Sequence, residues 1–477
     1  MFSKAGITEP AKTVRILESF WPSHKDVDPI SIETAGDWNL LQNLYSTLVE
    51  MSSSNTVNPA LAEKWEQNAE GTRWIFYLKE HLQWSDGSDM TGSQIVQSLQ
   101  RSLKKTAHTS LATFVSSITA QKTNQIVFEM KKTPLNFLTL LSFIDLGITH
   151  PKAYRYKKFS WDAPSSGAFQ ISTFNSNKIE LKENTHHWEK NQKKISTATL
   201  YRASGSHEDI GSLLNDNFDA SQLSPGVIEN ESDILALKNK YDIFVGNPDF
   251  LFCLNFSKKR TKQGKLPLIL RQSLFYKIYN GFWNGNKSSI YKATGLRPKR
   301  SMGSLTEEEF ETDFNTLASN ANNKKIKKID LLIREKFKNR GIVRKLIKSL
   351  GEFGIETNQI ILSGKKYDKA EKLGEYDLVV NFLGASEADP DTVWRIYNDS
   401  EFAESVVSGE ELNKAQSESN KKKREKLYKE FESKAIRKAL FIPLRYETTY
   451  IVTSKQVQLD YSLAVDWGLQ LYKLKFR

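Results

Sequence analysis

Residues 43–87 constrain the fold of this chain more than any other stretch, because they hold a strong strand pattern bounded by tryptophans and turns. Trp74, Phe76 and Leu78 recur at every second position, which predicts a strand with one buried face and a partly covered second face. An amphipathic helix is predicted to precede this strand and to end near Val49. The combination is typical of a mixed α/β domain.

The length of 477 residues favours about two or three domains, since a single core rarely organises so long a chain. A hydrophobic content of 39% with 26% charged residues is ordinary for a soluble globular chain. The longest apolar candidate, residues 134–148, is interrupted by polar residues and is predicted to be a buried helix rather than a membrane span. The single cysteine, Cys253, leaves no partner for an intrachain disulfide and is predicted to be a buried structural thiol.

The formal net charge is +12, and basic residues are concentrated at 321–350 and at 421–424. A nucleic-acid-binding surface would interleave such residues with aromatic side chains or carry a recognised binding motif, and neither pattern is found. We therefore expect no nucleic-acid partner and interpret the basic stretches as solvated helix faces. A basic surface facing anionic lipid or an acidic partner remains an alternative.

The patterns that usually accompany catalysis are absent from the sequence, which has no H-E-x-x-H, G-x-S-x-G or dinucleotide-binding fingerprint. His186 and His187 are adjacent, so on a strand their side chains would point to opposite faces and would not share a metal. We expect both to be surface or packing residues. The hypothesis is a binding protein that is not an enzyme and uses no cofactor or metal.

A β-α-β unit is predicted at 328–362, where a strand, a helix with one apolar face and a second strand follow one another. Such a unit places its strands parallel, with a right-handed crossover. A further strand at 376–382 ends at Phe382 and leads into the loop 384–391. Ligands of open α/β sheets bind beyond the carboxyl ends of the strands, so we expect Phe382 and this loop to contact a ligand.

The opening segment also carries a longer series of residues in a recognisable order and spacing, namely Asn43, Leu44, Tyr45, Leu48, Val49, Pro59, Leu61, Ala62, Trp65, Gly71, Phe76, Leu78, Lys79, Trp84, Asp86 and Gly87. In these positions the chain resembles the oligopeptide/dipeptide-binding family of extracytoplasmic solute receptors that serve ABC importers, the family 5 solute-binding proteins. The resemblance extends over residues 12–476, and its strongest motifs lie before residue 105.

The resemblance implies an α/β, two-lobed, periplasmic-binding-protein-like fold with an additional inserted α+β subdomain in the first lobe. The implied domains are a discontinuous main subdomain of lobe I at 11–50, 151–256 and 441–477, an inserted subdomain at 51–150, and lobe II at 257–440. The implied function is a receptor that closes around an oligopeptide or related small molecule and delivers it to an ABC-type membrane permease. The implied partners are a peptide or peptide-like ligand and the membrane subunits of the permease, and the implied state is a monomer.

Family members run an extended backbone past the ligand at the positions that correspond to Glu33, Thr34 and Ala35. A peptide would pair with this backbone as an added strand, through main-chain hydrogen bonds. An ordinary loop between a strand and a helix is the alternative. Trp38 is a further implied ligand contact from lobe I. Trp394 or Tyr446 would also line the pocket, but for each of them a position in the packed core is at least as favoured.

The clearest departure from the family lies in the loop 384–391. Peptide receptors of this family carry an aspartate four residues before the loop proline, where it pairs with the α-ammonium group of the peptide. The corresponding residue here is Ser386. The neighbouring Glu387 would substitute with the opposite side-chain direction if the segment is extended. The amine clamp is therefore either moved to Glu387 or lost, and in the second case the ligand lacks a free amine or is not a peptide.

The first residues of the sequence contain no apolar segment of the kind that a secretion signal needs. We expect either the mature part of a secreted precursor or a cytoplasmic protein, and the resemblance favours a periplasmic or extracytoplasmic location. The alternative function is a cytoplasmic ligand-sensing or interaction protein on the same scaffold, with altered or lost peptide binding.

Overall fold

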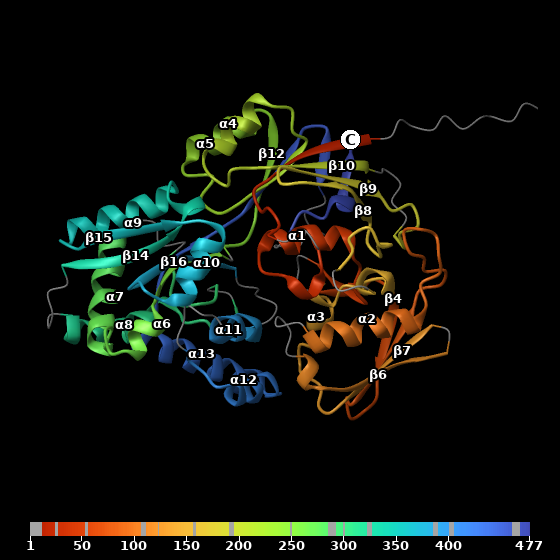
Figure 1. Ribbon diagram of the computed structural model, residues 1–477. Helices are drawn as coiled ribbons and strands as arrows, with labels where there is room; N and C mark the ends of the chain where they lie inside the picture. Colours follow the sequence, from red (N-terminus) through yellow and green to blue (C-terminus); the bar gives the residue numbers. More distant parts are fainter. Residues whose placement is uncertain are drawn as a thin grey trace, which may run out of the picture.

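Two large sheets form the cores of two lobes, and a third, smaller sheet belongs to a subdomain attached to lobe I (Figure 1). In Figure 1 lobe II lies on the left and the smaller subdomain at the lower right. The computed structural model describes residues 12–23, 27–52, 56–105, 111–122, 124–155, 159–189, 195–248, 250–284, 292–298, 301–321, 327–384, 390–399, 405–459 and 468–477. The predicted mixed α/β, two-lobed architecture is confirmed.

Lobe I is built on a seven-stranded sheet with β1 (Lys12–Glu18) near its centre, paired in parallel with both of its neighbours. Val14 and Ile16 pack against α1 (Ala35–Leu44) on one face, and Leu17 packs against α4 (Glu208–Asn215) and α5 (Glu231–Lys238) on the other. The strand order is β12 (Tyr241–Val245), β18 (Tyr450–Ser454), β11 (Ala220–Leu223), β1, β10 (Ile195–Arg202), β9 (Lys178–Glu183) and β8 (Phe169–Phe174). Helical layers on both sides thus bury the central strand.

The inserted subdomain is organised around β5 (Arg73–Leu78), the strand predicted from the period of two. Trp74, Phe76 and Leu78 are buried and the residues between them are half-buried, which confirms that prediction. The strand order of its antiparallel sheet is β4 (Ala62–Gln67), β5, β7 (Gln125–Met130) and β6 (Val115–Gln121). The helices α2 (Gly92–Lys105) and α3 (Phe137–Leu141) complete the core. The strands β2 (Val49–Met51) and β3 (Val57–Pro59) form a separate two-stranded ribbon.

Two helix predictions near this subdomain are wrong in their extent. α1 ends at Leu44, whereas Val49 is the first residue of β2. The Ser46 N–H donates to Ser166 Oγ at 3.0 Å, so contacts with a distant loop satisfy the backbone beyond Leu44 and stop the helix. The buried helix predicted at 134–148 is present only as α3 and a short 3-10 turn, Ile144–Leu146, although most of its side chains are buried as expected and Leu135 is the exception, at 54% exposed.

Lobe II is built on a five-stranded sheet in the order β15 (Glu356–Leu362), β14 (Lys328–Arg334), β16 (Leu378–Gly384), β13 (Phe250–Phe256) and β17 (Phe441–Glu447). β14 and β15 are parallel and are joined by α9 (Gly341–Glu352), which confirms the predicted β-α-β unit. The other helices are α6 (Lys258–Lys262), α7 (Leu268–Trp283), α8 (Glu307–Ala321), α10 (Gly364–Leu373), α11 (Pro390–Asp399), α12 (Gly409–Gln416) and α13 (Lys421–Arg437). No helix in the described ranges is both long and apolar enough to cross a bilayer.

β13 and β17 lie in the lobe II sheet, whereas the expected domain bounds placed 151–256 and 441–477 in lobe I. Every residue of β13 is buried, which suits a central strand between β16 and β17. The chain therefore passes between the lobes just before β13 and just after β17. The Gly246 N–H donates to the Thr449 carbonyl at 2.9 Å, so the two crossings lie side by side. A Cβ on Gly246 would come within 2.7 Å of Thr449 Oγ1, which is why this position suits glycine. A ribbon of β19 (Val457–Leu459) and β20 (Leu474–Phe476) completes lobe I.

Candidate ligand-binding site

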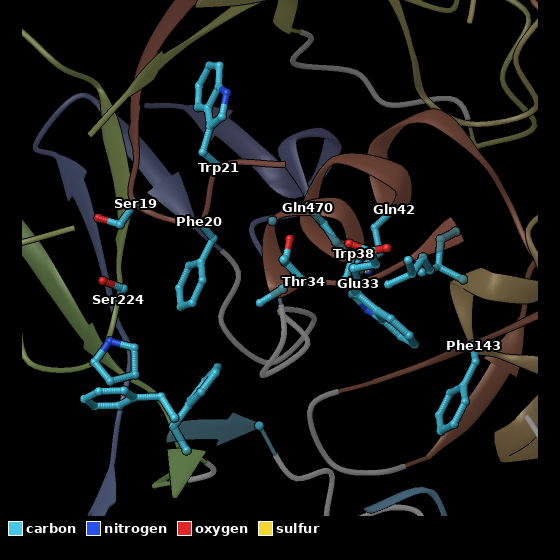
Figure 2. A pocket seen from close by; sticks show the side chains of 18 of the residues that line it. Ser19, Phe20, Trp21, Glu33, Thr34, Trp38, Gln42, Phe143, Ser224 and Gln470 are labelled. Carbon is cyan, nitrogen blue, oxygen red and sulfur yellow. Dashed lines mark hydrogen bonds between the residues drawn. The ribbon is translucent and has the colours of Figure 1, made fainter. Parts of the chain in front are cut away.

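A cavity of about 870 Å³ lies between the two lobes and is lined by residues of both. Its volume falls in the range of pockets that hold small-molecule or short-peptide ligands. Lobe I contributes the segment after β1, the start of α1 and the loops around Phe143 and Ser224 (Figure 2). Lobe II contributes the ends of β14 and β16 and one face of α11.

Asp37 holds the lobe I wall of this cavity in place. Its buried carboxylate accepts hydrogen bonds from the N–H groups of Ser23 (2.7 Å), Glu33 (3.1 Å) and Thr34 (2.9 Å). The Asp37 N–H in turn donates to Thr34 Oγ1 at 3.3 Å, which completes a capping box at the start of α1. Because the helix already begins at Ala35, the extended backbone expected here is cut short. Added-strand pairing stays a prediction and would depend on carbonyl groups, since both N–H donors are bonded to Asp37.

Aromatic side chains form much of the cavity surface. On lobe I, Trp38 meets Phe143 edge-on with ring centroids 5.7 Å apart. On lobe II, the ring centroids of Phe337 and Phe382 are 4.6 Å apart. Phe20, whose ring stacks on the first residue of β13, adds a further apolar surface on lobe I (Figure 2). These rings offer apolar and π contacts to a ligand, and the polar groups between them supply specificity.

The predicted site residues divide into three groups. Glu33, Thr34, Ala35, Trp38 and Phe382 all line the cavity, so the structure brings together residues from both lobes that are far apart in the sequence. Ser386 and Glu387 lie outside the described residues, and the relocated amine clamp therefore stays a prediction.

Trp394 and Tyr446 are in the core of lobe II and not among the lining residues. Trp394 is fully buried, because on α11 the cavity is lined by Val393 and Tyr397, one turn apart, and Trp394 points to another face. Tyr446 is 1% exposed, and its hydroxyl donates to the carbonyl of Arg297 at 2.5 Å. Core packing, the alternative considered for both, is what the structure shows.

The charged residues that line the cavity differ in how far neighbouring opposite charges compensate them. Glu50 accepts hydrogen bonds from Lys473 (3.2 Å) and from the hydroxyl of Tyr472 (3.2 Å), so its charge is already compensated. Burial in the cleft, reinforced by neighbouring arginines, lowers the pKa of Lys336 to about 8. Burial also lowers the pKa of Arg340 to about 10. Sequence reasoning missed these two cations because both belong to the basic stretch 321–350, which was interpreted as a solvated helix face.

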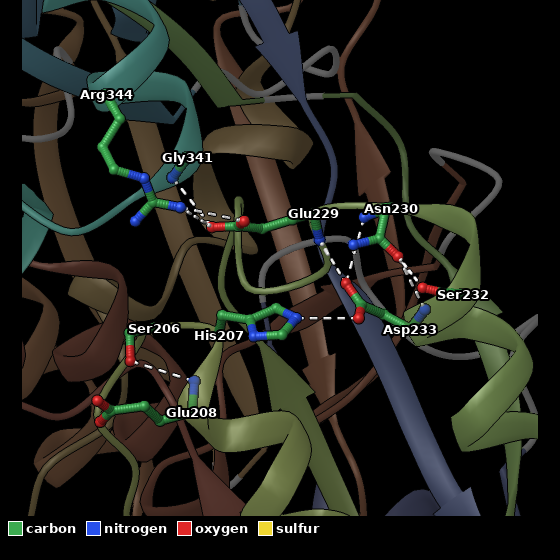
Figure 3. Close-up of polar contacts among 9 residues, drawn as sticks. All are labelled: Ser206, His207, Glu208, Glu229, Asn230, Ser232, Asp233, Gly341 and Arg344. Atoms are coloured by element: carbon green, nitrogen blue, oxygen red, sulfur yellow. Dashed lines mark hydrogen bonds and ion pairs between the residues drawn. The ribbon is translucent and has the colours of Figure 1, made fainter.

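Polar contacts join the lobes beside the cavity (Figure 3). Glu229 of lobe I accepts from the Gly341 N–H, the first residue of α9, at 3.0 Å and pairs with Arg344 at 3.3 Å. Asp233 accepts from the Glu229 N–H at 2.9 Å, which orients this loop, and lies 2.9 Å from His207 Nε2. The Glu229 carboxylate of lobe I thus lies at the positive, N-terminal end of the dipole of α9 in lobe II.

The remaining side chains singled out by sequence have local roles. Cys253 is buried, as predicted, and burial raises the pKa of its thiol. His186 Nδ1 lies 3.2 Å from Gln83 Oε1, while His187 Nε2 lies 3.4 Å from Ser46 Oγ. The adjacent histidines therefore meet different neighbours. Within the described ranges, no group of three or more His, Cys, Asp or Glu side chains is arranged to hold a metal ion.

The family profile described as "Bacterial extracellular solute-binding proteins, family 5 Middle" matches residues 56–261. Among curated relatives, the probable deoxycholate-binding periplasmic protein YgiS of Escherichia coli K12 is 37% identical over 84 residues, which is 17% of this chain and 16% of the relative. The periplasmic oligopeptide-binding protein OppA of Salmonella typhimurium LT2 is 24% identical over 213 residues, 39% of each chain. The matched segments thus span well under two thirds of these relatives.

Solved structures agree with the fold over almost the whole chain. The periplasmic binding protein DppA from Helicobacter pylori, in complex with the peptide STSA, matches with a TM-score of 0.80 at 17% identity and covers 98% of both chains. MoaA from A. tumefacien R10, in complex with mannopinic acid, matches with a TM-score of 0.82 at 15% identity, over 98% of this chain and 100% of that one. Residues 56–261 thus match the family 5 bacterial extracellular solute-binding proteins, and the whole chain has the two-lobed fold of solved periplasmic binding proteins.

Proposed function

We propose that this protein is a solute receptor that captures an oligopeptide or a related small molecule between its lobes, without chemical change, and delivers it to an ABC-type membrane permease. The observation that carries the proposal is the cavity of about 870 Å³ whose lining comes from both lobes. A ligand in this position contacts both walls only when the lobes are together, so it binds the closed arrangement more tightly than the open one. That difference in affinity is what shifts an open–closed equilibrium.

The chain crossings support a hinge. The lobes are connected by two short segments that lie side by side, and the Gly246–Thr449 backbone contact joins them. Rotation about a pair of adjacent crossings moves each lobe as a body while its sheet and core stay intact. The contacts of Glu229 with α9 are peripheral and polar, so they can break without opening either core.

The chemistry of the walls supports a ligand of mixed character. Aromatic rings such as Trp38 and Phe382 would contact apolar or planar parts of a ligand, and the charged groups would contact its polar ends. The relatives and neighbours support the same class, since one is an oligopeptide-binding protein and solved neighbours hold a peptide or mannopinic acid. A peptide and a peptide-like small molecule both stay within the proposal.

Delivery to a permease, an extracytoplasmic location and a monomeric state complete the proposal. The periplasmic names of the relatives support the location, and their family supports the coupling to a permease. Nothing in the comparisons favours the cytoplasmic sensing alternative. The proposal describes a binding protein rather than an enzyme.

The test is native mass spectrometry of gently purified protein, followed by denaturation and identification of any released molecule. We expect a bound species in the wild type and lower occupancy in Phe382→Ala, which removes a ring from the cavity wall. The matched control is Leu235→Ala, because Leu235 is 59% exposed and lies outside the cavity. The proposal is wrong if the protein carries nothing and no peptide or metabolite pool raises its melting temperature.

A further inference from the structure

The net positive charge of the chain belongs to lobe II. Residues 250–447, which run from β13 to β17, hold 39 Lys and Arg and 26 Asp and Glu, a net charge of +13. The rest of the chain holds 29 and 30, a net charge of −1. Such an imbalance shapes the electrostatic field around a protein and the partners that it attracts. An anionic partner is therefore drawn to lobe II and not to lobe I.

Six exposed lysines of lobe II, which form no ion pair within the described ranges, lie on α10, on α6 and in the loop after α6. We call them the lysine surface: Lys262, Lys265, Lys365, Lys366, Lys369 and Lys372. The two helices meet where α10 ends. Ser257 Oγ, at the start of α6, donates to the Gly374 carbonyl at 2.7 Å, and a Cβ on Gly374 would lie 2.9 Å from Lys259 Cβ. The lysine surface thus spans two adjoining elements.

The lysine surface faces away from the cavity. On α10, Tyr367 and Glu371 line the cavity, and the lysine stripe centred on Lys369 lies on the opposite side of the helix, since successive residues turn by about 100°. α6 begins just after the last residue of β13, whereas Phe250, the first residue of that strand, lines the cavity. The strand separates its two ends by about 20 Å, at about 3.3 Å per residue.

The acids around the lysine surface already have partners. Four of them pair with cations that do not belong to it: Asp330 and Asp377 with Arg260, Glu375 with Lys259, and Asp368 with Arg334. Glu371 accepts from the Tyr367 hydroxyl at 3.0 Å on the cavity side of α10. The positive charge of the six lysines is therefore left to solvent or to a partner.

Three of the four lysines on α10 are placed where they oppose the stability of the helix. Lys365 and Lys366 lie in its first turn, where a positive charge opposes the helix dipole. Lys369 is four residues from Lys365 and three from Lys366, and like charges at these spacings repel. Lys372, in the last turn, is the exception. A negatively charged partner would offset these costs.

Exposed aliphatic side chains lie beside the lysines. Leu373 follows Lys372 at the end of α10 and is 45% exposed. Leu268 and Ile269 begin α7, three residues after Lys265, and are 43% and 47% exposed. Lysines interspersed with exposed aliphatic residues are typical of surfaces that bind the headgroup region of an anionic membrane.

The composition of this region favours a lipid surface over an acidic protein. Protein interfaces are enriched in Arg and depleted in Lys. The arginine of α6, Arg260, is used inside lobe II, where it pairs with Asp330 at 2.9 Å and Asp377 at 2.5 Å. Lysine binds phosphate as a flexible point charge, so it suits headgroups that have no fixed positions.

We propose that the lysine surface docks lobe II on a bilayer that contains anionic phospholipid. The lysines attract the phosphate groups of the lipid, and the aliphatic side chains beside them enter the boundary between headgroups and acyl chains. The inference goes beyond the receptor function, because the surface lies on the side of α10 that faces away from the cavity. It assigns lobe II, and not lobe I, as the lobe that meets the membrane.

The test measures co-sedimentation of the full chain with vesicles of phosphatidylcholine alone, or of phosphatidylcholine with about one third phosphatidylglycerol. At about 0.1 M salt, where charges interact over about 10 Å, we expect partition onto the anionic vesicles to be stronger by about tenfold or more. At about 1 M salt, where that distance falls to about 3 Å, most of the difference should disappear.

The main variant combines Lys365→Gln, Lys369→Gln and Lys372→Gln. It should weaken partition onto the anionic vesicles by about 100-fold, at about fivefold for each lysine. Glutamine is a good helix former, so the melting temperature should not fall. A second variant, Lys262→Gln with Lys265→Gln, leaves α10 intact and should weaken partition by about 25-fold.

The matched control replaces the three lysines 421–423 with Gln, which removes the same charge from exposed side chains of α13. α13 lies on the other face of the lobe II sheet. Tyr428 of α13 belongs to the core that holds Leu331, whereas Tyr367 of α10 packs in the cluster that holds Leu332, the next residue of the same strand. The control should therefore change partition by less than about threefold.

Equal partition of the wild type onto neutral and anionic vesicles would overturn the docking surface. Equal losses in the α10 and α13 variants would also overturn it, because net charge alone would then set the attachment. Tighter binding to soluble polyglutamate than to vesicles of equal charge would assign an acidic protein partner instead. These results leave the receptor function standing, and a receptor that holds no ligand leaves the lysine surface standing.

Discussion

The two walls of the cavity differ in how their charged groups are satisfied. On the lobe I wall, the buried Asp37 accepts hydrogen bonds from Ser23, Glu33 and Thr34 at 2.6–3.1 Å. On the lobe II wall, Arg340 keeps a buried donor without an acceptor, and Lys336 has no ion pair in the part of the chain that the structure describes. The buried carboxylate of the first wall is satisfied without a ligand, although Gln42 Nε2 on that wall is buried without a hydrogen-bond partner among the described residues, and the cations of the second wall gain contacts from a ligand. We therefore expect lobe I to position a ligand and lobe II to select it.

The largest expected effect separates the lobe II wall from the core behind it. Trp394→Ala removes a fully buried side chain and should lower the free energy of unfolding by about 3–5 kcal/mol. Phe382→Ala, at the wall itself, should cost less stability and more ligand affinity. Urea denaturation gives the first quantity and calorimetric titration the second. A folded Trp394→Ala protein that has lost ligand affinity would show that Trp394 acts in the site after all.

The next effect concerns the completeness of the lobe I wall. Asp37→Ala leaves three partly buried backbone N–H groups without their acceptor and should lower the free energy of unfolding by about 2–4 kcal/mol, with weaker ligand binding. Glu411→Ala is the matched control, because Glu411 completes the same kind of capping box at α12, away from the cavity and from the contacts between the lobes. It should reduce stability and leave ligand affinity unchanged. Equal affinity losses in both variants would mean that general destabilisation, not the wall, is being measured.

Removal of a ring from the lobe I wall should weaken binding and also cost some stability, because Trp38 packs against two core clusters as well as lining the cavity. Trp38→Ala is expected to weaken ligand affinity by about 10- to 100-fold, since central aromatic contacts dominate binding energy. Trp161→Ala is the control, because Trp161 is 37% exposed and lies outside the cavity. Titration with the co-purified ligand measures both. Unchanged affinity in Trp38→Ala would remove the positioning role from this wall.

A pH dependence should distinguish the lobe II wall from lobe I. Lys336 has a pKa of about 8, lowered by burial and by Arg334, Arg340 and Arg202. An anionic ligand binds the protonated form, so affinity should be full near pH 6.5–7 and fall by about three- to tenfold as pH rises through 8 to 9. Lys336→Gln should flatten this profile, while Lys338→Gln should retain it. An affinity that rises with pH, or a profile unaffected by Lys336→Gln, would contradict a contact between Lys336 and an anionic group of the ligand.

The smallest effect is expected where the lobes meet outside the cavity. Glu229→Gln weakens the contacts with Gly341 and Arg344, which are partly exposed and contribute about 0.3–1 kcal/mol. Ligand affinity should fall about two- to fivefold, and small-angle scattering should show a larger open fraction. Glu352→Gln, on an exposed residue at the other end of α9, is the control. An effect as large as that of Asp37→Ala would mean that this contact, rather than the ligand, holds the lobes together.

Local pattern was a sound guide wherever one face of an element meets the core. The alternation of Trp74, Phe76 and Leu78 predicted β5, and the β-α-β unit at 328–362 was found with parallel strands. The local pattern failed where a distant segment supplied the hydrogen-bond partners of the backbone. This happens just after Leu44, where the loop around Ser166 ends α1. A hydrogen bond across more than a hundred residues leaves no periodic mark in the sequence.

The candidate site was predictable in part, for a related reason. Glu33, Trp38 and Phe382 line the cavity as expected, whereas Trp394 shares its helix with two lining residues and faces the core. A difference of one position on a helix turns a side chain by about 100°, and the sequence does not show which face meets the other lobe. Lys336 and Arg340 went unnoticed because surface and cleft lysines look the same in a basic stretch.

The sequence by itself determined the resemblance to family 5 solute-binding proteins, the layered α/β elements and part of the cavity wall, because these follow from short-range periodicity and from motifs in a recognisable order and spacing. Only the tertiary structure decided that β13 and β17 belong to lobe II, that Asp37 holds the lobe I wall in place, and that Lys336 and Arg340 line the same cavity as Arg202. Each of these depends on which distant segments of the chain come into contact. The burial of a side chain and the charges around it are set by those contacts and not by its neighbours in the sequence.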